Sequence, residues 1–561
     1  MTLERREPLT PSAMRSGMRQ LRSSLGSLAS VFGNLDLARL MIGWAGMTVT
    51  TWVFAIALGV YAFEAGGATA VGIAALVRLL PGALASPVAG LLGDRHSRRL
   101  VLMVSALLSG LAIALAAAAA AVGASSWVVY ALAGVFTVAS TPYVPAEGAL
   151  LPLVARTPQE LAAANVARNQ MDNLGFLLAA LAAGTLLALA SPEAAFAAAA
   201  AAGVLTAGIL ASLGRDERPF YADEIGPSGI LDETAVGLKA LMAEPKLRLV
   251  GITLGLLVFV EGAADVMIVV VALDLLELGQ GSVGWISATW GVGALLAGAA
   301  LAVLLDRGNL ATGLATGSLI VGAGLALPGV WPVVLAAYLC FFLMGFGFSF
   351  VEVAARTLLQ RLGSDETLAR VIGFLETSRL AAMALGAIVA PMLIALFGIR
   401  GALLALGAVL PLLALLRWRA LRAFEIGAAV SERNFSLLRG ASIFAPLPID
   451  TLEGVCRSLV ELDANAGQEV ITQGDHGDRF YLIDNGEVEV IEDGVFKRKQ
   501  TEGEGFGEIA LLRDVPRTAT VRTTRQTRLL ALDRERFIET VTGHVRSHQH
   551  AEAVVGGWLE R

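Results

Sequence analysis

Charged residues and cysteines are scarce in this sequence. Only 16% of its 561 residues are Asp, Glu, Lys or Arg, against about 25% in typical soluble domains. The only cysteines are Cys340, inside an apolar segment, and Cys456, near the C-terminus, and we expect no disulfide between them. Hydrophobic residues make up 56% of the chain. This composition predicts an integral membrane protein and excludes an ordinary soluble one.

Several signatures of chemistry are also missing. The sequence contains no Walker-type phosphate loop, no nucleophile triad and no cluster of metal-ligating residues. We therefore expect neither an enzyme, nor ATP-driven transport, nor a metal site. The formal net charge is −6, and no basic helix-turn-helix follows the last β-rich segment, so nothing indicates a nucleic-acid partner.

Long apolar runs occupy most of the first 416 residues. Each is about 20 residues long, which is enough for a helix to cross the hydrocarbon core of a bilayer. The first run begins too late, and too many others follow it, for a cleavable signal peptide. The sequence predicts twelve spans, at 38–63, 69–92, 100–122, 127–152, 161–189, 191–213, 249–276, 283–305, 311–328, 331–354, 369–396 and 400–416.

Lys and Arg residues fall on alternate sides of these spans. They follow spans two, four, six, eight and ten, and Arg400 is the exception in the opposite loops. The positive-inside rule then places both termini in the cytoplasm, in a multi-pass protein of the plasma (inner) membrane. The predicted parts are a tail (1–35), two six-helix bundles (36–213 and 249–416) with a loop between them (214–248), a linker (417–440) and a C-terminal domain (441–561).

The two bundles show signs of an internal repeat. A shift of 212 residues aligns Gly67 with Gly279, Val71-Gly72 with Val283-Gly284, and Asp94-Arg95 with Asp306-Arg307. The segment from Gly90 to Arg99, G-L-L-G-D-R-H-S-R-R, resembles the G-x-x-x-D-R-x-G-R-R signature of the major facilitator superfamily, with Ser97 in place of a glycine. This resemblance implies an all-α transporter of two six-helix pseudo-repeats, with a cleft between them near the membrane midplane.

The same segment is a candidate cytoplasmic gate. Gly90 permits close packing of helix ends, and Asp94 can interact with a helix N-terminus or with Arg98. The predicted gate consists of Gly90, Asp94, Arg95, Arg98 and Arg99. Alternatively, its arginines only satisfy the positive-inside rule.

The prolines and glycines of three spans bear on the direction of transport. Leu80-Pro81 and the segment 145–152 resemble exporters of the drug and siderophore efflux type. However, span five lacks the glycine-proline motif of antiporters. The direction of transport therefore stays open.

Ionisable residues inside the spans are the candidates for solute or ion coupling. Each costs about 2.5 to 3.5 kcal/mol at the bilayer centre, so it tends to mark a pathway or a paired network. Glu261 and Asp265 lie four residues apart on one helix face, which suits a shared proton or a cationic substrate. Glu376 and Arg379 are expected to neutralise one another. The candidate coupling or substrate residues are Glu261, Asp265, Arg78, Asp172, Glu376 and Arg379, with Glu147, Glu352 and Arg356 as further charged positions.

A glycine-rich segment near the C-terminus has the properties of an anion site. Its glycines, among them Gly507, allow the backbone to approach a ligand closely. Residues 508–512 can form one helical turn, whose N-terminal N–H groups attract an anion. Arg517 can offer a bidentate fork to the same anion. Glu508 would repel a phosphate unless it accepts hydrogen bonds from ribose hydroxyls, so the two residues together indicate a nucleotide.

The segment from Phe506 to Val521 resembles the phosphate-binding cassette of cyclic nucleotide-binding domains, and the resemblance extends over roughly 441–561. It implies a cytoplasmic β-roll with flanking helices, in which Glu508 binds the ribose 2′-hydroxyl and Arg517 the cyclic phosphate. Gly507 and Ala510 would supply backbone N–H groups. The implied binding residues are Phe506, Gly507, Glu508, Ile509, Ala510, Arg517, Thr518 and Ala519.

Local patterns agree with such a roll. Alternating residues at 487–491 and 518–522 predict strands, and turns are predicted at 475–477, Asn485-Gly486 and Asp493-Gly494. The resemblance also implies a helical lid over the base at about 544–561. Its apolar contacts would be Val554, Val555 and Trp558. A further helix is predicted within the linker, at 418–426.

These patterns predict a secondary active transporter, an exporter of small amphipathic or cationic solutes, that is regulated by a cyclic nucleotide. Cyclic AMP is favoured over cyclic GMP as the regulatory ligand, and membrane lipid is the other expected partner. Two other classes stay open, a non-transporting receptor or scaffold that responds to the nucleotide, and a lipid or lysolipid flippase. The cyclic nucleotide could also be the cargo. The sequence does not indicate the oligomeric state.

Overall fold

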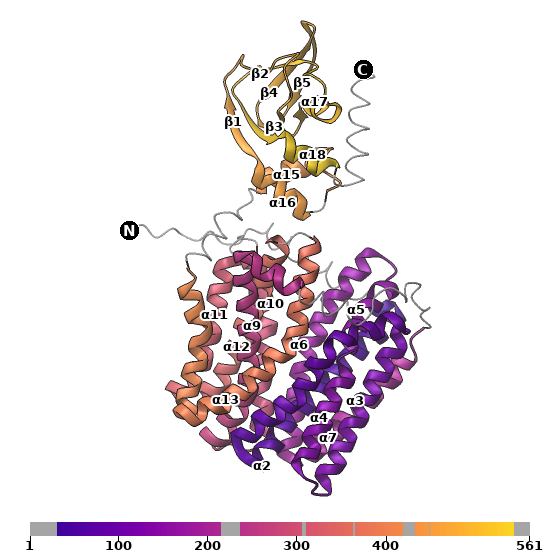
Figure 1. Ribbon diagram of the computed structural model, residues 1–561, viewed down its shortest axis with the longest axis vertical. Coiled ribbons are helices and arrows are strands. Elements are labelled where there is room, and N and C mark those ends of the chain that lie inside the picture. The colour runs from indigo at the N-terminus through magenta and orange to yellow at the C-terminus, as the bar shows by residue number, and fades with distance from the viewer. Residues whose placement is uncertain are drawn as a thin grey trace, which may run out of the picture. The chain divides into compact units, whose positions relative to one another are not determined.

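The computed structural model describes residues 31–214, 236–305, 310–362, 365–418, 432–447 and 449–542. The chain divides into two compact units, Met1–Arg422 and Ala423–Arg561, which are shown in Figure 1. The predicted lid at 544–561 lies outside the described residues, as does nearly all of the predicted linker helix at 418–426 and of the N-terminal tail.

The first unit is made of long apolar helices. Within hydrocarbon a helix satisfies its own backbone hydrogen bonds, which is why apolar runs of this length adopt it. Nine helices of the described residues are long and apolar enough to cross a membrane. The helical elements of the unit, including those too short to cross a membrane alone, are α2 (Leu35–Arg95), α3 (Arg98–Ala121), α4 (Ser126–Ser140), α5 (Tyr143–Val154), α6 (Pro158–Leu189), α7 (Pro192–Ala211), α9 (Pro245–Val270), η1 (Val271–Leu275), α10 (Gly281–Leu305), α11 (Leu310–Val330), α12 (Val334–Leu362) and α13 (Asp365–Leu416).

Two of these helices contain a break at glycine. In α2 the backbone leaves the helical conformation at Gly66 and Gly67, and in α13 it does so at Gly398. Gly67 and Gly398 have φ angles of +63° and +70°, which glycine adopts without steric cost. The predicted span at 127–152 is divided between α4 and α5, because Pro142 cannot donate the backbone hydrogen bond that a continuous helix needs.

The helices of this unit form two groups. Figure 1 shows α3, α4, α5 and α7 on one side, in indigo to magenta, and α9 to α13 on the other. The groups meet where α6 packs on α10 and α2 packs on α13. At the first contact Gly284 approaches the backbone of Gly184 so closely that a Cβ atom would collide with it. Small residues thus set the distance between the two groups.

The second unit is a β-roll flanked by helices. It has one sheet of order β1-β8-β3-β6 and a second of order β2-β7-β4-β5, and every pairing is antiparallel. The elements are α15 (Glu432–Gly440), α16 (Ile449–Ser458), β1 (Val460–Ala464), β2 (Glu469–Ile471), β3 (Arg479–Asn485), β4 (Glu487–Glu492), β5 (Val495–Thr501), β6 (Gly505–Phe506), α17 (Glu508–Arg513), β7 (Thr520–Thr523), β8 (Thr527–Asp533) and α18 (Arg534–Thr542).

The predicted turns serve two different purposes in this roll. Asp493 and Gly494 have φ angles of +51° and +77° and close the β4–β5 hairpin, as the Asp-Gly pair predicts. Asn485-Gly486 instead joins β3 to β4, which belong to different sheets. The chain therefore turns a corner of the roll there, and Gly486 has a φ angle of +128°.

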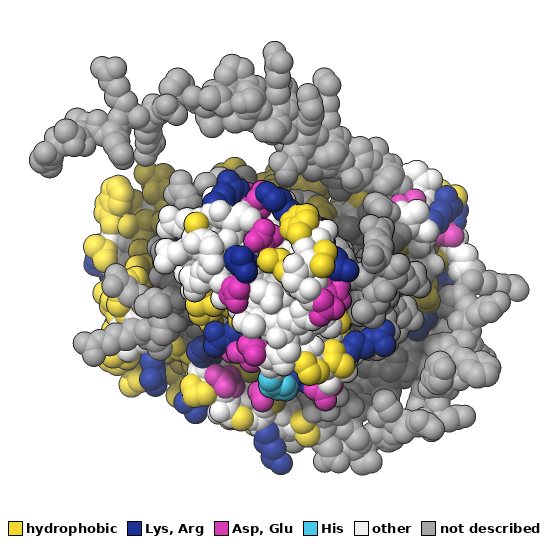
Figure 2. Space-filling model, turned by 90° about the horizontal axis from the view of Figure 1, so that it is seen from above, with side chains coloured by type: hydrophobic (Ala, Val, Ile, Leu, Met, Phe, Trp, Pro, Cys, Tyr) yellow, Lys and Arg dark blue, Asp and Glu magenta, His cyan; other side chains and the backbone are white. Residues whose placement is uncertain are grey.

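Aromatic side chains fill the space between the first sheet and the helices. Phe444, Phe480 and Phe537 are fully buried and lie with ring centroids 5.0 to 6.0 Å apart. Such aromatic contacts add to the free energy gained by burial of apolar area. The outer surface is mixed in charge. Figure 2 shows acidic and basic side chains interspersed, and several form cross-strand pairs, such as Lys499–Glu487 and Arg522–Glu469.

We expect Gly284→Ala to destabilise the first unit by about 1 to 3 kcal/mol, because the added methyl group overpacks the α6–α10 contact. Thermal unfolding of the purified full-length protein measures this. The matched control is Gly298→Ala on the same helix, where a Cβ atom would meet nothing within 4 Å. Equal melting temperatures for the two variants would contradict the packing described here.

Candidate functional site

The cassette segment of the second unit is held in an unusual backbone conformation. Gly507, which precedes α17, has a φ angle of +92°, and a Cβ atom there would lie 2.7 Å from Nη1 of Arg517. At the other end of α17, Asp514 has a φ angle of +52°. The segment is therefore a compact turn in which glycine is required at its first position.

Arg517 is anchored at both its backbone and its side chain. Its N–H donates to the carbonyl of Asp475 (2.8 Å), and its carbonyl accepts from Gly474 (2.9 Å). Its guanidinium donates to the carbonyls of Gly507 (3.0 Å) and Arg479 (2.8 Å). Arg517 is only 5% exposed, and this burial lowers its pKa from the ordinary arginine value.

One carboxylate also contacts the same guanidinium. Nη2 of Arg517 lies 3.3 Å from Oδ1 of Asp478, whose side chain is largely exposed. The guanidinium is buried, but water screens the exposed carboxylate of Asp478, which weakens its side of the pair. An anionic ligand could therefore replace Asp478 at modest cost while the two carbonyl contacts keep the guanidinium in place.

Glu508 lies in the same pocket and lacks a hydrogen-bond donor on one oxygen. The residue is 3% exposed, and Oε2 has no hydrogen-bond partner among the described residues. Burial raises the pKa of this carboxyl, while Arg498 and Arg517 act in the opposite direction. A buried acceptor without a donor is costly. The arrangement suits a ligand that brings hydroxyl groups to this oxygen.

The pocket wall combines predicted and unpredicted residues. All eight residues of the predicted nucleotide site line it. Ile471, Val490, Val521 and Arg498 line it as well, and they come from β2, β4, β7 and β5. Val521 is the last residue of the cassette segment, whereas no local motif marks Ile471, Val490 or Arg498 as part of a binding site. Only the pairing of the strands brings them next to the cassette.

The predicted gate segment connects α2 with α3. Ser97, which replaces a glycine of the signature, is the N-cap of α3, and its side chain accepts a hydrogen bond from the N–H of Leu100 at 3.3 Å. Arg99 donates to the carbonyl of Ala211 at the end of α7. Gly90, Asp94 and Arg95 lie in α2. The side chains of Asp94 and Arg95 are outside the described part. Arg98 begins α3.

The charged residues of the spans do not pair as we expected. Arg379 binds Glu261 of α9, with Nη2 at 3.2 and 3.1 Å from the two carboxylate oxygens. Glu376 binds Arg356 of α12 at 2.8 Å. The expected mutual neutralisation of Glu376 and Arg379 was therefore wrong. Their spacing on α13 allows contact, but each side chain reaches a better placed partner on a neighbouring helix.

The remaining candidates are also distributed between helices. Arg78 of α2 is buried and interacts electrostatically with Asp265 of α9. Asp172 of α6 accepts a hydrogen bond from the hydroxyl of Thr48 at 3.2 Å. Glu261 thus has a direct partner in Arg379, while Asp265 interacts electrostatically with Arg78, and a shared proton between the two carboxylates stays a prediction.

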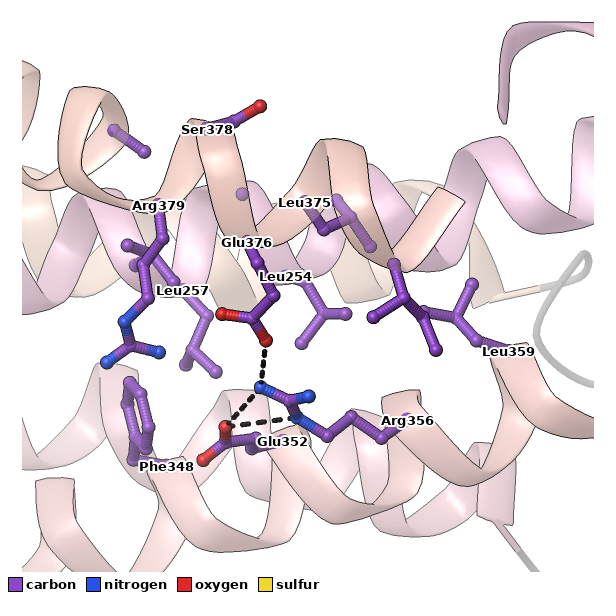
Figure 3. Close-up of a pocket in the computed structure, with 14 residues that line it drawn as sticks. Leu254, Leu257, Phe348, Glu352, Arg356, Leu359, Leu375, Glu376, Ser378 and Arg379 are labelled. Carbon is purple, nitrogen blue, oxygen red and sulfur yellow. Dashed lines mark hydrogen bonds and ion pairs between the residues drawn. The ribbon is translucent and has the colours of Figure 1, made fainter. Parts of the chain in front are cut away.

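A cavity opens between α9, α12 and α13. Figure 3 shows Arg356 between Glu352 and Glu376, at 3.2 and 2.8 Å, with Arg379 at the other end. The rest of the wall is mostly apolar and consists of Leu254, Gly255, Leu257, Val258, Phe348, Leu359, Ile372, Leu375, Ser378 and Ala382. Three carboxylates, those of Glu352, Glu376 and Glu261, face the two arginines of this region. Glu261 lies behind Arg379 and does not line the cavity, whose wall carries two carboxylates, Glu352 and Glu376, and two arginines, Arg356 and Arg379. The cavity therefore combines apolar walls with a formally balanced set of charges.

One charged group was missed. Arg168 of α6 forms an ion pair with Glu147 of α5, with Nε 2.9 Å from Oε2, and its guanidinium carbon lies 4.0 Å from the ring centroid of Trp44. Glu147 had been noted only as a charged position. Arg168 lies within the predicted span 161–189, so its charge in an apolar run was the signal that could have found it.

Comparison with known proteins agrees with this division of the chain. Residues 40–263 and 254–459 match the family model of the Major Facilitator Superfamily, which together is more than half of the chain. Residues 461–544 match the model of the cyclic nucleotide-binding domain.

Individual relatives cover one unit each. The cAMP-dependent protein kinase regulatory subunit of Yarrowia lipolytica is 42% identical over 110 residues, which are 19% of this chain and 29% of that protein. The chain thus spans less than a third of this relative. Residues of the first unit resemble the crystal structure of the nucleoside transporter NupG, with a TM-score of 0.57 and 14% identity over 69% of this chain and 99% of that one.

A second transporter structure gives the same result. It is a bacterial homolog of the human lysosomal transporter Spinster, with a TM-score of 0.57 and 15% identity over 70% of this chain and 98% of that one. At these identities the likeness concerns the fold. The chain therefore belongs to the Major Facilitator Superfamily, and it carries a cyclic nucleotide-binding domain at its C-terminal end.

Proposed function

We propose that this protein is a secondary active transporter, an exporter of small amphipathic or cationic solutes, whose transport cycle is regulated by a cyclic nucleotide. The observation that carries the proposal is the presence in one chain of two sites. One is a cavity in the membrane unit with apolar walls and two carboxylates, Glu352 and Glu376, that bind Arg356. The other is a pocket with a buried arginine and a buried carboxylate in the second unit.

The proposed membrane topology has twelve spans in two six-helix pseudo-repeats. The part of the chain that the structure describes contains nine helices of sufficient length and hydropathy. Adding α10, and counting α2 and α13 as two spans each because of their glycine breaks, gives twelve. The domain limits follow as 36–213, 249–416 and 441–561. We place both termini in the cytoplasm and the chain in the inner membrane, since the positive charges follow the even-numbered spans.

The proposed solute site is the cavity between α9, α12 and α13. Its carboxylates attract a cation, and its leucines and Phe348 can cover an apolar body. Arg356 already occupies the position between Glu352 and Glu376. An organic cation would compete with that guanidinium for the same two carboxylates. Because the walls are apolar and carry few polar groups, the cavity should accept solutes of different shapes instead of selecting one by specific hydrogen bonds.

The proposed regulatory ligand is cyclic AMP, which the name of the Yarrowia lipolytica relative favours over cyclic GMP. The cyclic phosphate would take the position of Asp478 beside Arg517, and a ribose hydroxyl would donate to Glu508. Regulation requires that the nucleotide bind one state of the transport cycle more tightly than the other. A coupling free energy of 1 to 3 kcal/mol would change activity about 5- to 150-fold.

Arg517→Ala should weaken cyclic AMP binding by about 2 to 5 kcal/mol, which is about thirtyfold or more, because it removes a buried cation that pairs with the phosphate. Isothermal titration calorimetry on the purified full-length protein, with cyclic AMP and cyclic GMP, measures this. Arg522→Ala is the matched control, since Arg522 is an exposed arginine on β7 that pairs with Glu469. Equal affinities of the wild type and Arg517→Ala would refute the nucleotide site.

Cyclic AMP affinity should increase with pH in the acid range. In the free protein burial raises the pKa of Glu508 above the ordinary carboxyl value, whereas hydroxyl donors favour the carboxylate form, so binding releases a proton. The affinity should rise by at most about tenfold per pH unit and level off above the raised pKa. Glu508→Gln should bind more weakly and lose this pH dependence. A dependence that persists in the variant would assign it to another group.

The transport function can be measured with tetraphenylphosphonium as a probe cation. In proteoliposomes with a pH gradient, the full-length protein should move the probe, and cyclic AMP should change the rate. Glu376→Gln should reduce transport severalfold, because it removes a cavity carboxylate. Glu244→Gln, at an exposed carboxylate before α9, should not. Nucleotide binding without any movement of the probe would favour the receptor alternative.

A further inference from the structure

Glu147 is the most completely buried carboxylate of the described residues in the membrane unit. Its side chain is 0% exposed, and its charged contact is the one with Nε of Arg168 at 2.9 Å. Apart from that contact, neither of its oxygens has a hydrogen-bond partner among the described residues. A carboxylate in such a position normally accepts several hydrogen bonds. Glu147 therefore has acceptor capacity that its surroundings do not use.

The guanidinium of Arg168 interacts with other groups besides Glu147. Its guanidinium lies over the ring of Trp44 at 4.0 Å, and it also interacts electrostatically with Asp172, one turn further along α6. Asp172 receives one hydrogen bond, from Thr48. One arginine on α6 thus faces two carboxylates.

The other charged groups near this cluster have partners of their own. Arg379 acts on Asp172 but binds Glu261 directly, and Glu352, which also acts on Asp172, pairs with Arg356. The charged side chains of α3, which packs on α5, are the two arginines at its start, and one of these, Arg99, donates to the end of α7.

Two neutral groups complete the surroundings of Glu147. The hydroxyl of Tyr143 lies one turn before it on α5 and interacts with it electrostatically. This hydroxyl and Nε1 of Trp44 are both buried and have no hydrogen-bond partner among the described residues. Both side chains carry a donor, and Trp44 contacts Arg168 and Tyr143. Among the described residues that contact the carboxylate, only Arg168 offers a full positive charge.

The charges of this cluster do not balance. Glu147 and Asp172 carry two negative charges against the single positive charge of Arg168. An uncompensated charge in a low-dielectric environment costs several kcal/mol, and a carboxyl group avoids this cost by binding a proton. Of the two carboxylates, Asp172 has a hydrogen bond from Thr48 and interacts with both Arg168 and Arg379. Among the described residues Glu147, by contrast, has Arg168 alone and no hydrogen bond from a hydroxyl. The proton is therefore best placed on Glu147.

We propose that Glu147 is a proton-binding site of the membrane unit, in which Arg168 is shared with Asp172 and a proton neutralises the remaining charge. This inference deepens the proposed transport function, since it names the coupling ion and its position. When Glu147 holds the proton, Arg168 is left to Asp172. When the proton leaves, Arg168 is drawn to Glu147, and Asp172 depends on Arg379, which also holds Glu261 of the solute region. Binding of the proton and binding of the cationic solute thus oppose each other, because both change which carboxylates Arg168 and Arg379 pair with. Exchange of a proton for a solute requires such opposition.

The experiment is infrared difference spectroscopy on the full-length protein reconstituted in lipid, between alkaline and acid buffer. Protonation of a buried carboxylate produces the C=O stretching band of a carboxylic acid, which shifts in D₂O. The wild type should show such absorption, and Glu147→Gln should lose one component of it, the Glu147 band, while the component of Glu508 stays. Glu244→Gln, the same substitution at an exposed carboxylate, should keep both.

A second variant keeps the test decisive if Glu147→Gln does not fold. Arg168→Gln removes the cation that favours the ionised carboxylate, so the band should appear at a pH about one unit or more higher than in the wild type. A band that is unchanged in Glu147→Gln, or a midpoint that does not move in Arg168→Gln, would overturn the proposal. The readout does not depend on transport. Loss of the band in a chain that moves no solute would retain the proton site and reject the transport function.

Discussion

The cost of removing a charge from water governs both functional regions of this protein. An ion in a low-dielectric interior must be paired, hydrogen-bonded or neutralised. In the second unit Arg517 meets this requirement with two backbone carbonyls, while Glu508 meets it only in part. In the membrane unit Arg379 binds Glu261, and Arg356 lies between two glutamates. Glu508 and Glu147, whose requirement is incompletely met, are the groups that we assign to a ribose hydroxyl and to a proton.

Close backbone packing complements this electrostatic design. Gly284 and Gly184 bring α6 and α10 together, and Gly72 brings α2 against Ala387 and Pro391 of α13. These contacts leave no room for side chains, so they permit a tight seam without specific polar bonds. A seam held by packing can separate and reform at little electrostatic cost. The ionic contacts within each group can then respond to solute and proton, as alternating access requires.

The two proposed sites share one chemical feature. The nucleotide pocket uses an arginine whose exposed partner, Asp478, can be replaced, and the cavity uses an arginine, Arg356, whose place a cation can take. In both sites an internal ion pair occupies the position proposed for the ligand. Such a pair keeps the site formed in the absence of ligand and lowers the cost of organising it.

Much of this protein follows from local patterns in its sequence. Apolar runs of bilayer length determine helices, because a helix satisfies its backbone within the segment, and the cassette from Phe506 to Val521 determines a turn that sets Glu508 near Arg517. The pairing of charges was decided only by the tertiary structure. Arg379 lies three residues from Glu376 yet binds Glu261, 118 residues away, and Arg168 reaches Glu147 on another helix. Spacing along one helix shows which residues share a face, whereas the rotation and depth of neighbouring helices determine what that face meets.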